Sequence, residues 1–171
     1  MNKQKWTETS LDSLMDLLEN EEPTVRQKAR KSLVAMGKPA VSSLTGALRN
    51  SKLEHVRWEA AKALDTIGDI RAIPSLVKAL EDNNSDVTWL TAEALRKFKK
   101  IAWPSLMRAL MKSSQDSVLL RTGAHHVLRN QKEDGFDDLL VTLREALESS
   151  TASELTPFAA SNILKRMKTK S

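Results

Sequence analysis

The chain has 171 residues, 40% of them hydrophobic, and it contains no cysteine and no tyrosine. The absence of cysteine excludes disulfides, thiolate nucleophiles and cysteine metal ligands. Lysine and arginine number 27 against 22 acidic residues, an excess compatible with a nucleic acid partner, an acidic protein partner or simple solubility. No apolar run has the length of a signal-peptide core or a membrane span, so we expect a cytoplasmic protein without a membrane segment.

A pattern that begins with valine recurs along the chain at a fixed interval. Val25, Val56 and Val87 are 31 residues apart, and small and apolar residues follow each of them in similar order. Self-similarity at this period is typical of a solenoid, in which every repeat packs only on its neighbours. We therefore predict one elongated domain without strands.

Each repeat is expected to be a helical hairpin with leucines on the first helix and the valine near the start of the second. The expected first helices centre on residues 11–18, 41–48, 73–80, 103–110 and 136–147. The expected second helices begin at Val25, Val56, Val87, Leu120 and Thr156. The repeats then span residues 8–37, 38–68, 69–100, 101–132 and 133–171. The predicted fold is an all-α, right-handed α-solenoid of about five hairpins.

The second helices have a simple internal pattern when the valine is counted as position one. Apolar residues occupy positions one, five, eight, nine and twelve, which form one face of a helix. Gly37 and Gly68 follow the last apolar residue, where a left-handed cap ends a helix at little cost. Positions three, four, seven and eleven lie on the opposite side, so we expect them to be exposed.

The repeat resembles the short HEAT repeat of the phycobilisome-lyase-like class. The resemblance is carried by residues 68–80, by Asp86-Val87, and by the Val-Arg-x-x-Ala-Ala-x-Ala-Leu of residues 56–64. It implies a ladder in which an acid just before the valine pairs with the arginine of a neighbouring unit. Thr24 and His55 stand where acids are expected, so we predict only a partial ladder and order based mainly on apolar packing.

Three departures from the repeat are expected to change the local structure. Thr88 replaces the arginine found at the second position of three other units, as Arg26, Arg57 and Arg121. Phe98-Lys99-Lys100 replaces the Ile-Gly-Asp turn, which we expect to be altered. Pro157 stands at the arginine position of the last unit, where we place it in the first turn of a helix, a position that tolerates proline.

The second helices of such solenoids line the concave surface, which is the usual binding face. Trp58 and Trp89 occupy the same position in adjacent repeats, either as exposed anchors or half-buried in the seam between repeats. Lysines and arginines are frequent in the same layer, which indicates either an attractive surface for an anion or simple complementarity to helix dipoles. The candidate partner-binding residues are Trp58, Trp89, Lys28, Lys31, Lys62, Leu90, Arg96, Lys97 and His126.

Nothing in the sequence points to catalysis, a cofactor or a metal. His125 and His126 are adjacent on a helix, so their side chains should diverge by about 100°. We therefore predict a non-catalytic scaffold that binds a helical or acidic segment of a partner protein. Binding of nucleic acid along a basic groove is the alternative, and handling of a bilin, implied only by the resemblance to lyase-type repeats, is the third. The sequence indicates no oligomeric state.

Overall fold

The computed structural model describes residues 8–112, 117–149 and 151–169, and over these residues the chain is helical without any strand. The α-helices are α1 (Glu8–Asp16), α2 (Pro23–Met36), α3 (Val41–Asn50), α4 (Glu54–Ile67), α5 (Ile73–Lys78), α6 (Ser85–Phe98), α7 (Trp103–Lys112), α8 (Val118–Leu128), α9 (Asp137–Glu148) and α10 (Ala152–Thr169). Short 3₁₀ helices flank several of them: η1 (Leu17–Glu19), η2 (Lys38–Ala40), η3 (Ile70–Ala72), η4 (Ala79–Glu81) and η5 (Lys99–Ile101). The predicted all-α solenoid is confirmed.

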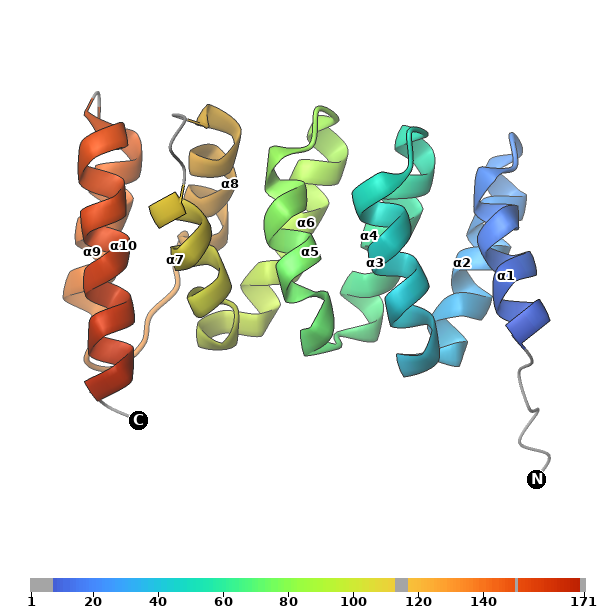
Figure 1. The fold of residues 1–171 in the computed structure, drawn as a ribbon, viewed down its shortest axis with the longest axis horizontal. Coiled ribbons are helices and arrows are strands. Elements are labelled where there is room, and N and C mark those ends of the chain that lie inside the picture. The colour runs from blue at the N-terminus through green and yellow to red at the C-terminus, as the bar shows by residue number, and fades with distance from the viewer. Residues whose placement is uncertain (1–7, 113–116, 150, 170–171) are drawn as a thin grey trace.

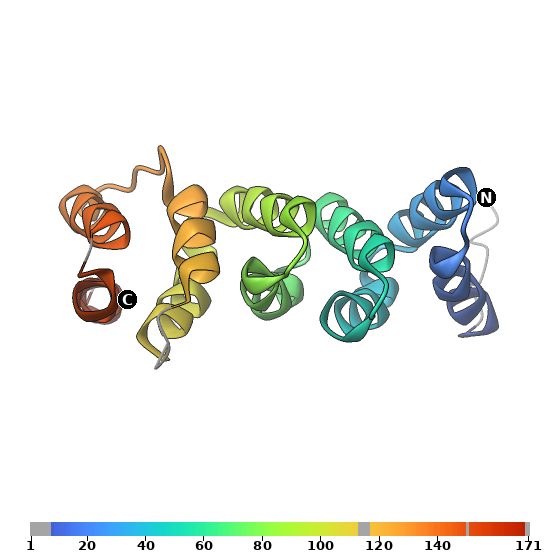
Figure 2. The same ribbon diagram turned by 90° about the horizontal axis from the view of Figure 1, so that it is seen from above.

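The helices form two layers that run the length of the molecule (Figure 1). One layer contains α1, α3, α5, α7 and α10, and the other contains α2, α4, α6, α8 and α9, as the view from above shows (Figure 2). Within the second layer α4 packs on both α2 and α6, and α8 packs on α6. Each repeat therefore contacts its neighbours, as a solenoid requires, and α5 also packs on α3 and α7 in the first layer.

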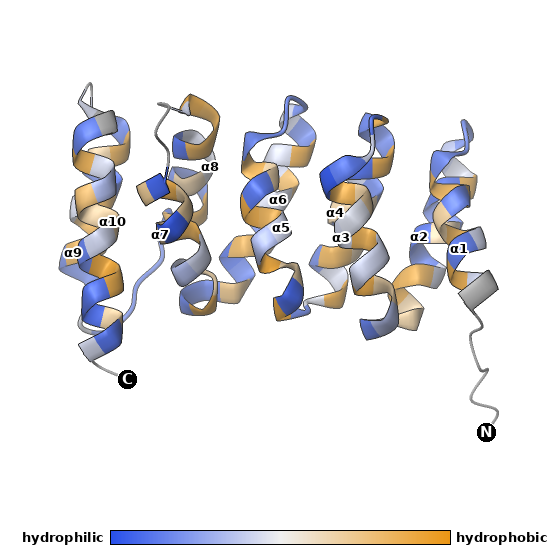
Figure 3. Ribbon diagram, viewed as in Figure 1, coloured by the Kyte–Doolittle hydropathy of each residue, from blue (hydrophilic) through white to orange (hydrophobic). Residues whose placement is uncertain are grey.

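The period of the sequence is reproduced in the helices. α2, α4 and α6 begin at Pro23, Glu54 and Ser85, each two residues before the valine that defines the repeat. The buried residues of these helices are mostly apolar, and hydrophobic and hydrophilic bands alternate along the ribbon (Figure 3). Trp103, predicted to serve packing, is only 1% exposed and stacks edge-on against Phe136 with the ring centroids 5.7 Å apart.

The turn between second helices and the next first helix needs a backbone that most residues avoid. Gly68 is the predicted left-handed cap, with φ of 66° and ψ of 27°. Gly37 also has a positive φ, 69°, but its ψ of −129° lies outside the left-handed region, so the prediction of a left-handed cap was wrong there. Lys99 occupies the equivalent position of the third repeat and also has a positive φ, 51°, with ψ of −136°. The turn at Phe98-Lys99-Lys100 is thus close to that at Gly37, whose ψ is −129°, although its residue is not glycine.

The last hairpin reverses the order of its two helices. α9 packs against α8 in the second layer, while α10 packs against α7 in the first layer. We expected Phe136 to Leu147 to be a first-layer helix with its partner in the second layer, and this expectation was wrong. After α8 the chain continues into its neighbour α9 in the same layer, which leaves the surface of α7 to be covered by α10. Phe136, just before α9, is buried and its ring meets that of Trp103 on α7.

The placement of Pro157 was also wrong. α10 begins at Ala152, so Pro157 lies inside the helix, beyond its first turn. Proline there has no amide hydrogen to donate, but the carbonyl that goes without this bond belongs to residue 153, at the start of the helix. The lost bond is therefore confined to the end of α10.

Candidate functional site

The exposed side of α2, α4, α6 and α8, turned away from the first layer, is called here the second-helix face. Positions three and seven of the repeat lie on it: Trp89 is 58% exposed, and Glu93 and His126 are half-buried. Position four of α4, α6 and α8 does not. Leu90 is only 3% exposed and Glu59, at the same position of α4, is 5% exposed.

The assignment of Leu90 to the binding surface is therefore wrong. A second helix is covered by its hairpin partner and also by the second helix of the preceding repeat, so its buried arc is wider than the five predicted positions. Glu59 shows that position four points toward the preceding repeat, because its carboxylate lies 2.9 Å from Arg30 and 3.8 Å from Arg26 of α2. Gly123 of α8, also at position four, packs on Leu80, where an added Cβ would lie 3.0 Å from the leucine side chain.

Trp89 belongs to a connected group of four residues on α6 and α8. Its indole meets the ring of His126 edge to face, with centroids 6.4 Å apart. His126 Nε2 lies 2.5 Å from Glu93 Oε1, and Arg96 Nη1 donates to the same oxygen at 2.7 Å. These contacts, with that from His126 first, hold the pKa of Glu93 below its ordinary value of 4.5. Trp89, Glu93, Arg96 and His126 are called the Trp89 cluster.

Trp58 has a different environment from Trp89, although both occupy position three. Its ring is half-buried and packs against the core, and the Arg30 guanidinium lies 5.5 Å from the ring centroid. Beneath it, burial raises the pKa of Glu59 above its ordinary value, and Arg30 and Arg26 oppose that shift. Of the two alternatives left open by the sequence, exposure applies to Trp89 and half-burial to Trp58.

Trp58 also borders a hollow of about 450 Å³ at the N-terminal ends of α2, α4 and α6. The hollow is lined by Pro23, Thr24, Arg26, Gln27, Arg30, Glu54, His55, Trp58, Glu59, Asn84 and Asp86. Two arginines and three acids line it, and Glu59 lies close to both arginines, so it carries no strong excess of either charge. Arg26 is further held by the carbonyls of Asn20 and Glu21, both at 2.8 Å, which is a structural role.

The predicted basic residues do not form one continuous positive stripe. Lys28 and Lys31 are exposed on α2, and Lys62 is half-buried on α4. Lys97 donates to both carboxylate oxygens of Asp65, at 2.6 and 2.8 Å, and Arg96 is paired with Glu93. Lys97 and Arg96 are therefore partly neutralised. The pairing of Lys97 with Asp65 joins residues 32 positions apart, which local sequence patterns do not reveal.

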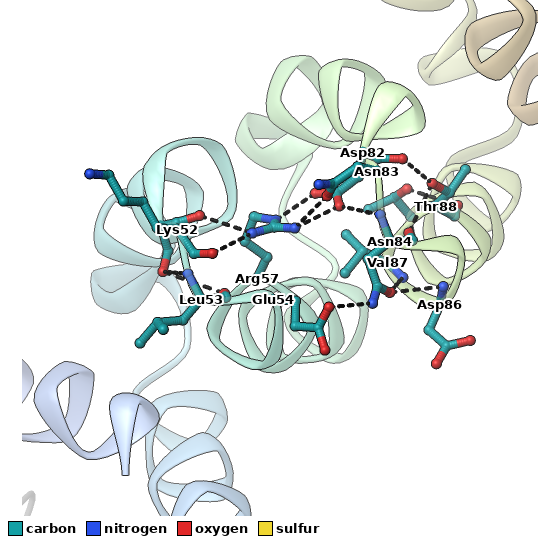
Figure 4. Close-up of polar contacts among 12 residues, drawn as sticks. Lys52, Leu53, Glu54, Arg57, Asp82, Asn83, Asn84, Asp86, Val87 and Thr88 are labelled. Atoms are coloured by element: carbon teal, nitrogen blue, oxygen red, sulfur yellow. Dashed lines mark hydrogen bonds and ion pairs between the residues drawn. The ribbon is translucent and has the colours of Figure 1, made fainter. Parts of the chain in front are cut away.

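One rung of an inter-repeat ladder fixes α4 against the following repeat (Figure 4). Arg57 donates from Nε and Nη2 to the two oxygens of Asp82 at 2.7 and 2.9 Å, and from Nη1 to the carbonyls of Ser51 and Lys52. Hydrogen bonding to Asp82 raises the pKa of Arg57. The acid of this rung lies five residues before Val87 and not directly before it, where the resemblance predicts an acid.

Thr88 takes over part of the role of the arginine that it replaces. Its hydroxyl donates to the carbonyls of Asp82 and Asn84 at 3.1 and 3.2 Å, as Arg57 does for Ser51 one repeat earlier. The short side chain secures the loop of its own repeat, whereas Arg57 reaches onward to the next. A rung therefore joins the second repeat to the third, as a partial ladder requires, but its acid is Asp82 and not the residue just before the valine.

The two adjacent histidines point to different partners. His125 Nε2 lies 2.8 Å from Glu148 on α9, and His126 faces Glu93 on α6. Over the described residues, no group of three or more histidine, aspartate and glutamate side chains is placed to hold a metal ion. No described helix combines the length and the apolar character needed to cross a membrane.

The profile of HEAT repeats matches residues 41–128, just over half of the chain. The chain belongs to the HEAT-repeat family. The matched region runs from α3 to α8 and contains the Trp89 cluster and the Arg57 rung. No curated protein matches the chain. HEAT repeats are commonly scaffolds for protein interactions, and the family is generally non-catalytic.

Proposed function

We propose that this HEAT-repeat protein is a non-catalytic scaffold that binds a segment of a partner protein on its second-helix face, with Trp89 as the anchor. The observation that carries the proposal is the 58% exposure of the Trp89 indole in a fixed position. The ring is held by His126, which is itself held by Glu93, so little side-chain freedom remains to be lost on binding. Rigid, exposed tryptophans are favoured as anchors of protein interfaces.

The proposal is tested by affinity capture with the full chain followed by binding measurements with the purified partner. Trp89→Ala should weaken that binding by tenfold or more, about what a hot-spot residue contributes. Phe158→Ala is the matched control, because Phe158 is 67% exposed but lies on α10 in the first layer. Equal loss in both variants would mean that exposed apolar area alone drives the capture, which contradicts the proposed site.

Nucleic acid binding along a basic groove is less well supported. Glu93 and Asp65 lie among the bases of the second-helix face and pair with Arg96 and Lys97. A phosphate backbone needs a continuous row of available cations, and its binding weakens steeply as salt rises. Titration of a fluorescent single-stranded oligonucleotide at rising salt separates this function from the scaffold.

The phycobilisome-lyase-like subtype is proposed only on the residues quoted for it, since the match is to HEAT repeats in general. Bilin handling would follow from that subtype and is the least supported function, because a shared repeat does not carry an activity with it. An unchanged visible spectrum of a bilin after mixing with the protein would exclude it. We also propose that the described helices form a single domain.

A further inference from the structure

A second hollow, of about 520 Å³, lies between the C-terminal ends of α6 and α8. It adjoins the Trp89 cluster, because Glu93 and Arg96 belong to both. Its lining residues are Glu93, Arg96, Lys97, Lys99, Arg129, Asn130, Gln131, Lys132 and Glu133. Five of these are cations and two are acids, so the hollow is strongly basic, unlike the one beside Trp58.

Both acids of the basic hollow already have cationic partners. Glu93 is bound by Arg96 and His126, and Glu133 accepts a hydrogen bond from Lys100 at 3.0 Å. Lys97 is paired with Asp65 outside the hollow. Within the described part of the chain, the cations that then remain without a carboxylate partner are Lys99, Arg129 and Lys132, all of which are exposed.

Helix dipoles do not explain three unpaired cations. The C-terminal ends of α6 and α8 together contribute the equivalent of about one negative charge, at roughly half a charge for each helix. Three exposed cations exceed that charge, so the hollow keeps a net positive field. A field of this kind, close to an exposed indole, suits a partner that brings its own negative charge.

The backbone at Lys99 adds an independent observation. The positions one and two periods earlier are Gly68 and Gly37, whereas here a lysine has φ of 51° and ψ of −136°. Side chains rarely adopt this conformation, so glycine would be the less strained residue. Asn130, on the α8 side of the hollow, also has a positive φ, 62°. The turn after α6 thus carries a cation at a position where the backbone conformation favours glycine.

We infer that the basic hollow binds an acidic stretch of the partner segment whose apolar residue rests on Trp89, an inference that depends on the proposed scaffold function. Trp89 and the end of α6 at residues 97–99 are separated by about 12–15 Å, at about 1.5 Å per helical residue. An extended chain covers that distance in about four or five residues, at about 3.3 Å each. The expected motif is an aromatic or large aliphatic residue followed or preceded, after about four residues, by several aspartates or glutamates.

A protein segment fits this surface better than a nucleic acid. Along α6, Glu93 lies between Trp89 and the unpaired cations at the end of the helix. A nucleic acid, which carries a phosphate at every nucleotide, would therefore place a phosphate near the Glu93 carboxylate. A segment that concentrates its charge at one end avoids Glu93. The charge pattern of the face therefore selects an acidic run beside an apolar anchor.

The test uses the full chain and three fluorescent probes. The first is a synthetic peptide with one leucine, a four-residue Gly-Ser spacer and four glutamates, the second has glutamine for each glutamate, and the third is a single-stranded oligothymidine. The glutamate peptide should bind saturably and at least tenfold tighter than the glutamine peptide. Equal affinity for both peptides, or tighter binding of the oligonucleotide, would overturn the inference.

A pair of substitutions at one position separates charge from strain. Lys99→Gln and Lys99→Gly should each weaken binding of the glutamate peptide about two- to fivefold, the range expected for one exposed ion pair. Lys99→Gly should also raise the midpoint of thermal unfolding, whereas Lys99→Gln should leave it unchanged. Lys132→Gln should weaken binding as Lys99→Gln does. Lys78→Gln, an exposed lysine on α5 in the other layer, serves as the matched control.

The outcomes distinguish this inference from the scaffold proposal. Loss of partner binding in Trp89→Ala, with no loss in Lys99→Gln and Lys132→Gln, would reject the acidic motif and leave the scaffold standing. Loss in the lysine variants but not in Trp89→Ala would support the basic hollow and reject Trp89 as the anchor. Equal weakening by Lys78→Gln would show a diffuse charge effect and reject the hollow.

Discussion

Arg57 is the residue whose removal should most disturb the stacking of the second and third repeats. Its guanidinium joins the loop before α4 to the loop before α6 by five hydrogen bonds, two of them to the Asp82 carboxylate (Figure 4). The side chains of Arg57 and Asp82 are only 12% and 7% exposed. Arg57→Ala would therefore leave a largely buried carboxylate that keeps only its bond from the Asn84 amide.

The expected loss can be worked from these contacts. Each hydrogen bond to a charged group contributes about 1.5–3 kcal/mol, and removal of one partner from a fully buried ion pair costs about 3–5 kcal/mol. Because the pair is not completely buried, we expect Arg57→Ala to lower the free energy of unfolding by about 2–4 kcal/mol. In a chain of this size that corresponds to a fall of roughly 4–16 °C in the melting temperature.

Urea unfolding followed by circular dichroism measures this loss, and Arg71→Ala is its matched control. Arg71 also pairs with an aspartate, Asp69 at 2.8 Å, and also donates to a carbonyl of the preceding repeat, that of Lys38. Its side chain is 59% exposed, so its loss should be far smaller. A double-mutant cycle of Arg57 and Asp82 should give a coupling free energy of at least about 1 kcal/mol. If Arg57→Ala and Arg71→Ala cost the same, burial of the rung does not matter and the reasoning fails.

Three further predictions follow from the turns, the core and the Trp89 cluster. Gly37→Ala should cost about 2–3 kcal/mol in urea unfolding, because a ψ of −129° with positive φ strains a residue that carries a Cβ. Gly68→Asn should cost less than about 1 kcal/mol, because Gly68 lies in the left-handed region that asparagine tolerates. Equal costs would contradict the assignment of the two turns. Trp103→Ala should cost about 3–5 kcal/mol and Trp89→Ala less than about 1 kcal/mol by the same assay, since one ring is buried and the other exposed. Because the pKa of Glu93 is lowered in the folded protein, the ionised carboxylate stabilises the fold above pH 4.5, and this stabilisation is lost as the pH falls through the lowered pKa. The loss of unfolding free energy caused by Glu93→Gln should therefore shrink on acidification below pH 4.5. A loss that does not depend on pH would show that the carboxylate charge is not involved.

The sequence was sufficient to predict the hairpins because their signals are local. The valines at a period of 31 residues placed the starts of α2, α4 and α6 to within two residues, and the glycines marked where α2 and α4 end. It failed where the answer depends on contacts between repeats. Leu90 is predicted to be exposed when its helix is considered alone, and it is only 3% exposed in the stack. The compartment, the handedness of the stack and the concavity of the second-helix face remain predictions.

The binding surface shows the same division between local and distant information. Helical spacing placed Trp89 and His126 on one face, and the structure brings their rings together. The pairing of Lys97 with Asp65 and the basic hollow depend on the relative position of helices more than 30 residues apart, which no local pattern encodes. A sign was nevertheless present, since Lys99 interrupts a series of glycines at the same period.

The reversal of the last hairpin has an electrostatic consequence. α2, α4, α6 and α8 all run in one direction, so neighbouring macrodipoles in that layer lie parallel and repel each other, whereas α9 runs opposite to α8 (Figure 1). The partially negative end of α8 and the partially positive end of α9 therefore adjoin, with Asp137 and Asp138 in the first turn of α9. The α8–α9 contact gains an attraction that the contacts among the parallel helices lack, and it does so without any additional side chain.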